Sequence, residues 1–390
     1  MNLTLQHGTI VAKPETYVYY ALASYILVIG IIGTAENMLV MLVFIRSKSM
    51  WTPSNVFIFD LALSDLLICI LGFPFLTISG FCKEWIFSEA GCSAYAFSMS
   101  VTGMHSIFIL TILAVERLKV ISRPLKMVKI VSKKRSFLLV LISWTFAIFV
   151  SIPPLLGWNR YVLEGLHISC SYDMFDGSWR SKSYIVFLIG IFLVVLLIII
   201  FCYLALFLKV QRQATSMRVM IKDSRDLLAE RERQRENKLI WMGCNITLAF
   251  VLSWGPYALV TILSIFKVLN EKNSLIIVTF PSFFAKSFTI YNPIIYIFSY
   301  PKFKKELSKL LLLTNKRKLA ERFLQKTIFS ATRGSIPNSA FNINSEGVNI
   351  IGEAGHVDDE SGGNQSEIWE VRIKNDNRAI SSFIEMITKL

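Results

Sequence analysis

The stretch FPSFFAKSFTIYNPIIYIF, from Phe280 to Phe298, is apolar and aromatic on both sides of one charged residue, Lys286. It belongs to an apolar span at about 274–299 that is long enough to cross a membrane. An ammonium group at the centre of a membrane helix costs at least ~2.5 kcal/mol. The stretch therefore predicts a membrane helix and a function of the lysine that repays this cost.

Six further spans of this kind are found along the chain. Two are interrupted by single polar residues, at about 16–45 and 54–81. Four are uncharged, and they lie between Glu89 and Glu116, Arg135 and Arg160, Lys182 and Lys209, and Lys238 and Lys267. A helix needs about 20 residues to cross the hydrocarbon core. We therefore predict an all-α membrane protein, a seven-transmembrane helix bundle, in agreement with 54% hydrophobic and 17% charged residues.

The distribution of Lys and Arg predicts the orientation. Basic residues follow the first span and crowd the segments between spans three and four and between five and six. By the positive-inside rule, the N-terminus lies outside and the C-terminus inside. The net charge of +14 then reflects topology, and we expect no nucleic-acid partner.

The same reading divides the chain into four parts. We expect an extracellular N-terminus at 1–17 with a glycosylation sequon at Asn2, and the helix bundle at 18–300. An amphipathic cytoplasmic helix on the membrane surface, at 301–314, follows the seventh span. A cytoplasmic, largely disordered tail is expected at 315–390, because its composition turns rich in Ser, Asn, Gly and Glu.

Signature residues occur on these spans in a fixed order. Together they resemble the motifs of rhodopsin-class G-protein-coupled receptors, over roughly 16–312, and they are Asn37, Asp65, Glu116, Arg117, Trp144, Tyr203, Trp254, Pro256, Asn292, Pro293 and Tyr296. Three positions depart from the usual pattern: Leu118 replaces an aromatic residue, Glu36 a small residue and Val195 a proline.

The resemblance implies a cytoplasmic switch and a polar network inside the bundle. Arg117 would fork onto Glu116 and onto Glu236 at the base of helix six, and this contact would break when helix six swings outward. Tyr203 and Tyr296 would serve the activated state. Asn37, Asp65 and Asn292 would satisfy one another or share water. The implied partners are a heterotrimeric G protein, with arrestin and a receptor kinase at the tail.

Lys286 lies six residues before Asn292, and this offset resembles the opsins, the retinal-binding branch of the class. The resemblance implies a Schiff base between Lys286 and retinal, with the 11-cis isomer in the dark. The remaining pocket would consist of Tyr95, Gly103, Phe187, Phe192, Trp254, Tyr257 and Ala258, although each of these could be ordinary core. Lys286 itself could instead snorkel, pair with a carboxylate or bind an anionic ligand.

The segment between spans four and five, GWNRYVLEGLHISCSYD, resembles the opsin plug over retinal. Cys82, Cys92 and Cys170 are the outer cysteines, so the residues alone predict one disulfide and one free thiol. The resemblance pairs Cys92 with Cys170 and makes Glu164 the counterion, as in invertebrate-type and other bistable opsins, because Tyr95 stands at the vertebrate counterion position. A solvated Glu164 is the alternative.

The sequence thus predicts a light-activated receptor of the plasma membrane or of a photoreceptive membrane. One rival is a retinal photoisomerase of the same fold, and another is a receptor for a diffusible ligand. A transporter is less favoured because no inverted repeat is visible. No catalytic triad, P-loop or metal cluster is found, so we predict neither an enzyme nor a metal site. Glu36, Asp60 and Cys82 receive no role.

Overall fold

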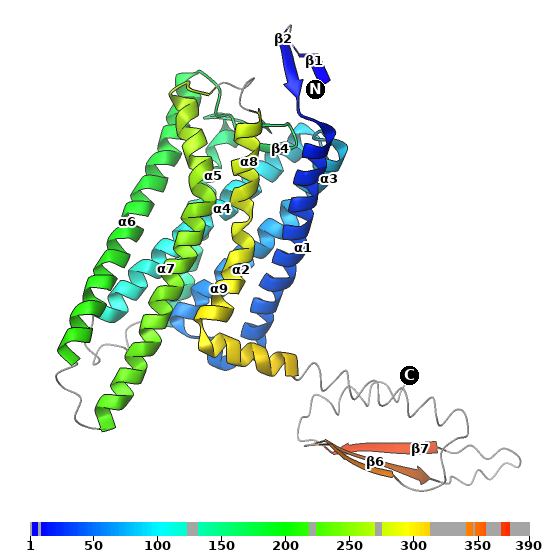
Figure 1. Ribbon diagram of the computed structural model, residues 1–390, viewed down its shortest axis with the longest axis vertical. Helices are drawn as coiled ribbons and strands as arrows, with labels where there is room; N and C mark the ends of the chain where they lie inside the picture. Colours follow the sequence, from blue (N-terminus) through cyan, green and yellow to red (C-terminus); the bar gives the residue numbers. More distant parts are fainter. Residues whose placement is uncertain are drawn as a thin grey trace, which may run out of the picture. The chain divides into compact units, whose positions relative to one another are not determined.

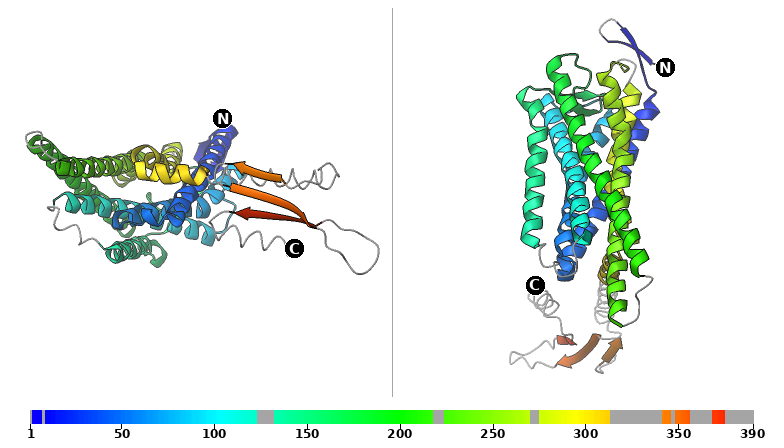
Figure 2. Two further views of the ribbon diagram at one scale, coloured as in Figure 1. Left: turned by 90° about the horizontal axis from the view of Figure 1, so that it is seen from below. Right: turned by 90° about the vertical axis from the view of Figure 1, so that its left-hand side faces the viewer.

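The computed structural model describes residues 2–6, 9–122, 132–217, 224–269, 275–312, 341–345, 348–355 and 368–374. They fall into two compact units, Met1–Leu310 and Leu311–Leu390. The first unit contains long helices that run side by side in one general direction (Figures 1 and 2). This unit holds every residue of the candidate site.

Six spans of the first unit are long and apolar enough to cross a membrane. They are formed by α1 Thr16–Arg46, α2 Pro53–Leu71 with α3 Phe73–Cys82, α4 Glu89–Ser122, α5 Lys133–Ser151, α6 Trp179–Met217 and α7 Ser224–Ile265. The seventh consists of α8 Leu275–Lys286 and α9 Phe288–Ser299, with 12 residues each. Each of these two is about 18 Å long, so only both together cross a hydrocarbon core of about 30 Å. The predicted seven-span bundle is confirmed.

The break between α8 and α9 lies directly after Lys286. The Ser287 amide donates to the Phe284 carbonyl at 3.0 Å, and the Ile290 amide donates to the Ser287 carbonyl at 3.2 Å, so the backbone tightens into i to i+3 turns. The sequence analysis predicted one continuous helix here. Because a tight turn ends α8 at Lys286, the lysine is the last residue of the outer half of the span.

Pro293 has a second effect on this span. It lacks an N–H group, so the carbonyl of Thr289, four residues earlier, has no helical donor from that position. The side-chain amide of Asn37 on α1 donates to this carbonyl at 2.9 Å and to the Gly33 carbonyl at 2.8 Å. α1 and α9 are therefore joined at the proline. Nearby, the Asn292 amide donates to Asp65 at 2.7 Å.

A β-hairpin covers the outer end of the bundle. The short helix η3 Pro153–Leu156 precedes β3 Tyr161–Glu164 and β4 Ser169–Tyr172, which pair antiparallel with Glu164 opposite Ser169. The Leu166 amide donates to the Thr279 hydroxyl of α8 at 2.9 Å. Gly165 has φ +53°, and a Cβ there would lie 2.1 Å from that hydroxyl, so only glycine fits the turn.

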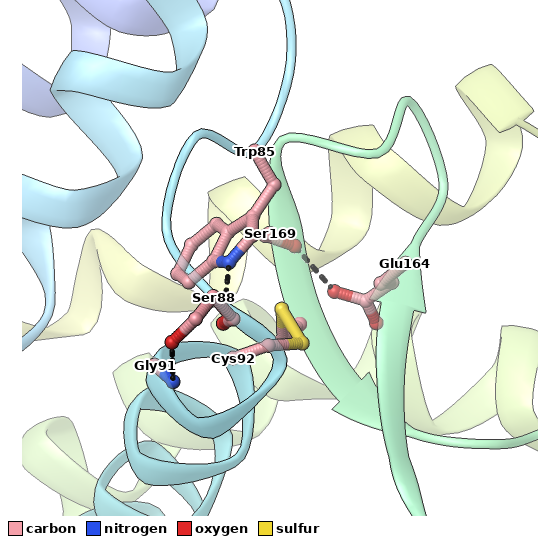
Figure 3. Close-up of a disulfide and its surroundings, with 7 residues drawn as sticks. Trp85, Ser88, Gly91, Cys92, Glu164 and Ser169 are labelled. Atoms are coloured by element: carbon pink, nitrogen blue, oxygen red, sulfur yellow. Dashed lines mark hydrogen bonds between the residues drawn. A yellow bond between two sulfur atoms is a disulfide. The ribbon is translucent and has the colours of Figure 1, made fainter.

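A disulfide fixes the other side of the hairpin. Cys170 on β4 is bonded to Cys92 in the first turn of α4 (Figure 3). Cys82 at the end of α3 is an exposed free thiol. The hairpin is thus bound to α4 covalently and to α8 by a hydrogen bond, which makes it a lid over the bundle.

A helix over 301–312 follows α9 and turns across the end of the bundle (Figure 1). Phe303 and Leu307 are buried, Leu311 and Leu312 are exposed, and the Lys302 ammonium donates to the carbonyl of Ser49, just after the start of the short helix η1 Lys48–Met50. This placement suits an amphipathic helix on a membrane surface.

The chain ends contain strands that the sequence analysis did not predict. β1 Asn2–Gln6 and β2 Thr9–Lys13 form a hairpin, and the Asn2 side chain lies outside the described residues. In the second unit, β5 Phe341–Ser345, β6 Val348–Gly355 and β7 Ile368–Lys374 form an antiparallel sheet. The expectation of a largely disordered tail at 315–390 stays a prediction, and the apolar residues Trp369, Val371 and Ile373 of β7 alternate as in a strand.

Candidate functional site

A cavity of about 150 Å³ lies beneath the lid hairpin, among α4, α6, α7 and α8. Eight of the predicted site residues line it: Tyr95, Gly103, Glu164, Phe192, Trp254, Tyr257, Ala258 and Lys286. Phe187 does not line it, because its ring stacks on Trp158 at a centroid distance of 5.4 Å. Leu188 is four residues from Phe192 and shares its face of α6, so Leu188 lines the cavity instead.

The lining is mostly apolar and aromatic, and Glu164 and Lys286 bring the charged groups into it. Gly103 on α4 brings that helix against Trp254, since a Cβ at Gly103 would lie 3.0 Å from the edge of the indole. The volume is below the 300–1,000 Å³ that is common for ligand sites. Met99 and Met104 also line the cavity, and their flexible side chains can yield to a larger occupant.

Two buried polar atoms in this lining lack a partner. Within the part of the chain that the structure describes, the Tyr95 hydroxyl and the Trp254 indole N–H have no hydrogen bond. Buried polar groups without partners cost free energy and are rare in native proteins. Both groups therefore fit a site whose hydrogen bonds are completed by an occupant or by water.

Lys286 ends α8 with its amine directed into this cavity. The Nζ atom donates to the carbonyl of Ser282 at 2.9 Å and to its hydroxyl at 3.0 Å. It also lies 5.5 Å from the centre of the Phe283 ring, within the range of a cation–π contact. The side chain lines the cavity and is not turned toward lipid.

Glu164 brings a carboxylate to the same place from the lid hairpin, with 7% of its surface exposed. Three hydroxyl groups donate to it: Tyr257 at 2.5 Å, Ser282 at 2.8 Å and Ser169 at 2.9 Å. The Ser169 bond is drawn in Figure 3. Glu164 is therefore a buried residue of the lid hairpin and not a solvated loop residue, and the three hydroxyl donors hold both of its carboxylate oxygens in place.

Ser282 and Ser169 were missed by the sequence analysis. Ser282 lies one helical turn before Lys286, so its i, i+4 spacing could have identified it. Ser169 lies opposite Glu164 across the hairpin, and only the register of the strands brings the two together.

At the cytoplasmic end, the Glu116 carboxylate is buried and accepts hydrogen bonds from Lys119 at 3.0 Å and Arg135 at 3.3 Å. The sequence analysis did not predict these two partners. Arg117 is also buried. The side chain of Glu236, its predicted partner, lies outside the described residues.

Two tyrosines of the predicted switch lie among these helices. The hydroxyl of Tyr203 on α6 accepts a hydrogen bond from Thr247 on α7 at 3.5 Å. Tyr296 on α9 is fully buried and packs edge-on against Phe303. Tyr203 therefore lies at a contact between α6 and α7, and Tyr296 at a contact between α9 and the helix that follows it. A rearrangement of the cytoplasmic end would change both contacts.

A second buried polar cluster lies between α2, α4 and α5. The Asp60 carboxylate contacts the His105 imidazole at 2.8 Å and accepts the Trp144 indole N–H at 3.0 Å. The His105 and Trp144 rings stack at 3.9 Å, and the other imidazole nitrogen contacts Ser143 at 3.0 Å. Sequence reasoning missed this cluster because the three helices that form it are distant in the chain.

Comparison with known proteins agrees with this geometry. Residues 36–296 match the family described as seven-transmembrane receptors of the rhodopsin family. The chain is 37% identical to a rhodopsin of Todarodes pacificus over 298 residues, 75% of this chain and 66% of that protein. It is 35% identical over 295 residues to a protein of Mizuhopecten yessoensis named "Rhodopsin, GQ-coupled", 74% of this chain and 59% of that protein.

Human melanopsin is 36% identical over 300 residues, 75% of this chain and 62% of melanopsin. The chain thus spans about three fifths to two thirds of the length of these relatives. The crystal structure of squid rhodopsin superimposes with a TM-score of 0.73 at 33% identity, covering 78% of this chain and 88% of the squid chain.

Proposed function

Because the chain belongs to the rhodopsin family of seven-transmembrane receptors, we propose that it is a light-activated G-protein-coupled receptor that holds retinal covalently at Lys286. The observation that carries the proposal is the amine of Lys286 in an aromatic cavity, connected through one hydroxyl to the buried carboxylate of Glu164. Retinal, when bound, supplies an aldehyde that joins this amine and a polyene that light isomerises.

The side chains around the amine prepare it for this role. Glu164 balances a positive charge on the linkage nitrogen, and its three hydroxyl donors hold the carboxylate in place. The lid hairpin closes the outer end and keeps bulk water from the nitrogen. Where water is excluded, the local dielectric constant falls, so the attraction between Glu164 and the charged nitrogen becomes stronger.

Trp254 and Pro256 are the proposed link from the cavity to the cytoplasm. The indole packs against Gly103, and Pro256 lies inside α7 two residues further on. A proline inside a helix weakens the backbone hydrogen bonds there and creates a hinge. Pressure on the indole would therefore pivot α7 and open the cytoplasmic end near Arg117 to the α-subunit of a heterotrimeric G protein.

We also propose finer details of this function. The name of the Mizuhopecten protein makes a Gq-type protein the first partner to test. We further propose the 11-cis isomer in the dark, an arrestin and a receptor kinase at the cytoplasmic tail, and a site in the plasma membrane or a photoreceptive membrane.

The test is reconstitution of the purified chain with 11-cis-retinal in darkness. We expect a visible absorption band that changes on illumination, borohydride trapping of the label on Lys286, and no band for Lys286→Ala. Illumination should also accelerate loading of a GTP analogue onto a Gq-type protein. A visible absorption band without light-dependent loading of the GTP analogue onto any G protein would favour a retinal photoisomerase. The absence of a visible band would favour a receptor for a diffusible ligand.

A further inference from the structure

The hydroxyl of Ser282 lies between the amine of Lys286 and the carboxylate of Glu164. It lies on α8 with 4% of its surface exposed. Its hydroxyl accepts from Lys286 Nζ at 3.0 Å and donates to Glu164 Oε2 at 2.8 Å. A hydroxyl has one proton and two lone pairs, so it can form both bonds at once.

The direction of these bonds depends on the charge of the nitrogen. A protonated nitrogen donates to the hydroxyl, and the hydroxyl in turn donates to the carboxylate, so the two bond dipoles are aligned and strengthen each other. A neutral amine donates to Ser282 more weakly than an ammonium group, and the deprotonated nitrogen of an imine has no proton to donate. The chain of bonds therefore favours the protonated form of the nitrogen, because it connects a positive charge there with the carboxylate of Glu164.

The other donors to Glu164 do not share this position. Ser169 donates to the same oxygen from the lid, and Tyr257 donates to the other oxygen from α7. Among the side chains that the structure describes, Ser282 is the one with hydrogen bonds to both Lys286 and Glu164.

We propose that Ser282 is the positioning residue that relays the charge of Glu164 to the nitrogen of Lys286 and thereby sets the pH range in which the pigment absorbs visible light. The inference rests on the proposed function for its spectral consequence, although the relay itself is a property of the protein without retinal. Replacement of the Ser282 hydroxyl should destabilise the protonated form of the Lys286 nitrogen, while the carboxylate of Glu164 stays in place.

The first experiment uses the full chain without retinal. Reductive methylation of Lys286 by formaldehyde and cyanoborohydride, followed by mass spectrometry, is measured across neutral to alkaline pH. Ser282→Ala should move the midpoint of reactivity downward by about one pH unit, as expected for the loss of one hydrogen bond to a charged group. Ser282→Thr, which keeps the hydroxyl, should restore the midpoint.

Ser287→Ala is the matched control. Ser287 is the residue next to Lys286, but its hydroxyl contacts the Phe284 carbonyl at 2.7 Å and the Tyr291 hydroxyl at 3.0 Å. Its removal should leave the midpoint of Lys286 unchanged. Thermal unfolding of every variant checks that the fold is intact. An unshifted midpoint in Ser282→Ala, or an equal shift in Ser287→Ala, overturns the relay.

The second experiment measures the pH at which half of the visible band is lost in the reconstituted pigment. Ser282→Ala should lower this pH, and Ser282→Thr should restore it. If no variant forms a pigment while the amine midpoint still moves, the proposed function fails and the relay stands. If the pigment forms and neither midpoint moves, the relay fails and the proposed function stands.

Discussion

Replacement of Glu164 by Gln tests the central electrostatic claim, because it removes the charge and keeps the size of the side chain. A bridging hydroxyl with bonds of 2.8 and 3.0 Å separates Lys286 Nζ and the carboxylate by roughly 5 Å. At an effective dielectric constant of about 20, two unit charges at this distance attract by about 3 kcal/mol. This corresponds to a shift of about two pH units.

The assay is an alkaline titration of the visible band in the reconstituted pigment. Glu164→Gln should lower the pH of half loss by about two units, so that part or all of the absorbance at neutral pH moves into the ultraviolet. Glu89→Gln is the matched control, because Glu89 is an exposed carboxylate at the start of α4 and does not line the cavity that holds Lys286. An unchanged visible band in Glu164→Gln would show that another anion balances the nitrogen.

Four further predictions follow from the described contacts. Asp60→Leu leaves two buried ring nitrogens unpaired and should cost roughly 2–4 kcal/mol in thermal unfolding, whereas Asp60→Asn should cost much less. Gly103→Val should abolish the visible band in a folded protein, whereas Gly190→Ala, with nothing within 4 Å of its Cβ, should not. The hydrogen bonds from Ser181 and Ser178 lower the pKa of Asp176 to about 2. The stability that this ionised carboxylate contributes is fully present above about pH 3.8 and is lost as the pH falls toward 2. Asp176→Asn should therefore reduce the dependence of the free energy of unfolding on pH in this range, measured by unfolding at a series of acidic pH values. Tyr257→Phe should raise light-independent G-protein loading, by tenfold at most, and also lower the pH of half loss of the visible band.

The sequence predicted the positions that carry charge or interrupt an apolar span. Lys286 stands alone in an apolar window, and Glu164 and the two bonded cysteines follow from the opsin-like spacing of the outer loop. Such residues can be identified because a membrane span tolerates a charge only where something compensates it. The number of spans follows from the lengths of the apolar stretches.

The residues that complete the site are of another kind. Ser282 is a small polar residue in an apolar helix, and its role appears only when the hairpin places Glu164 beside it. Asp60 and His105 come from separate helices, and no spacing along the chain predicts their contact. Phe187 was predicted to line the cavity, but its face of α6 is set by packing against Trp158. These contacts depend on how the helices and the hairpin are placed against one another in the fold, and residue spacing along a single sequence does not predict that placement.

The contact of Tyr257 with Glu164 joins the charge of the site to the position of α7. Tyr257 follows the hinge residue Pro256 directly, and its hydroxyl forms a 2.5 Å bond to the lid carboxylate. A pivot of α7 would lengthen this bond and weaken the hold on the charge that balances Lys286. Because such coupling is reciprocal, a change that weakens the carboxylate's bond must also ease the movement of α7. The two effects of Tyr257→Phe must therefore appear together, and either effect alone would mean that the lid charge and α7 move independently.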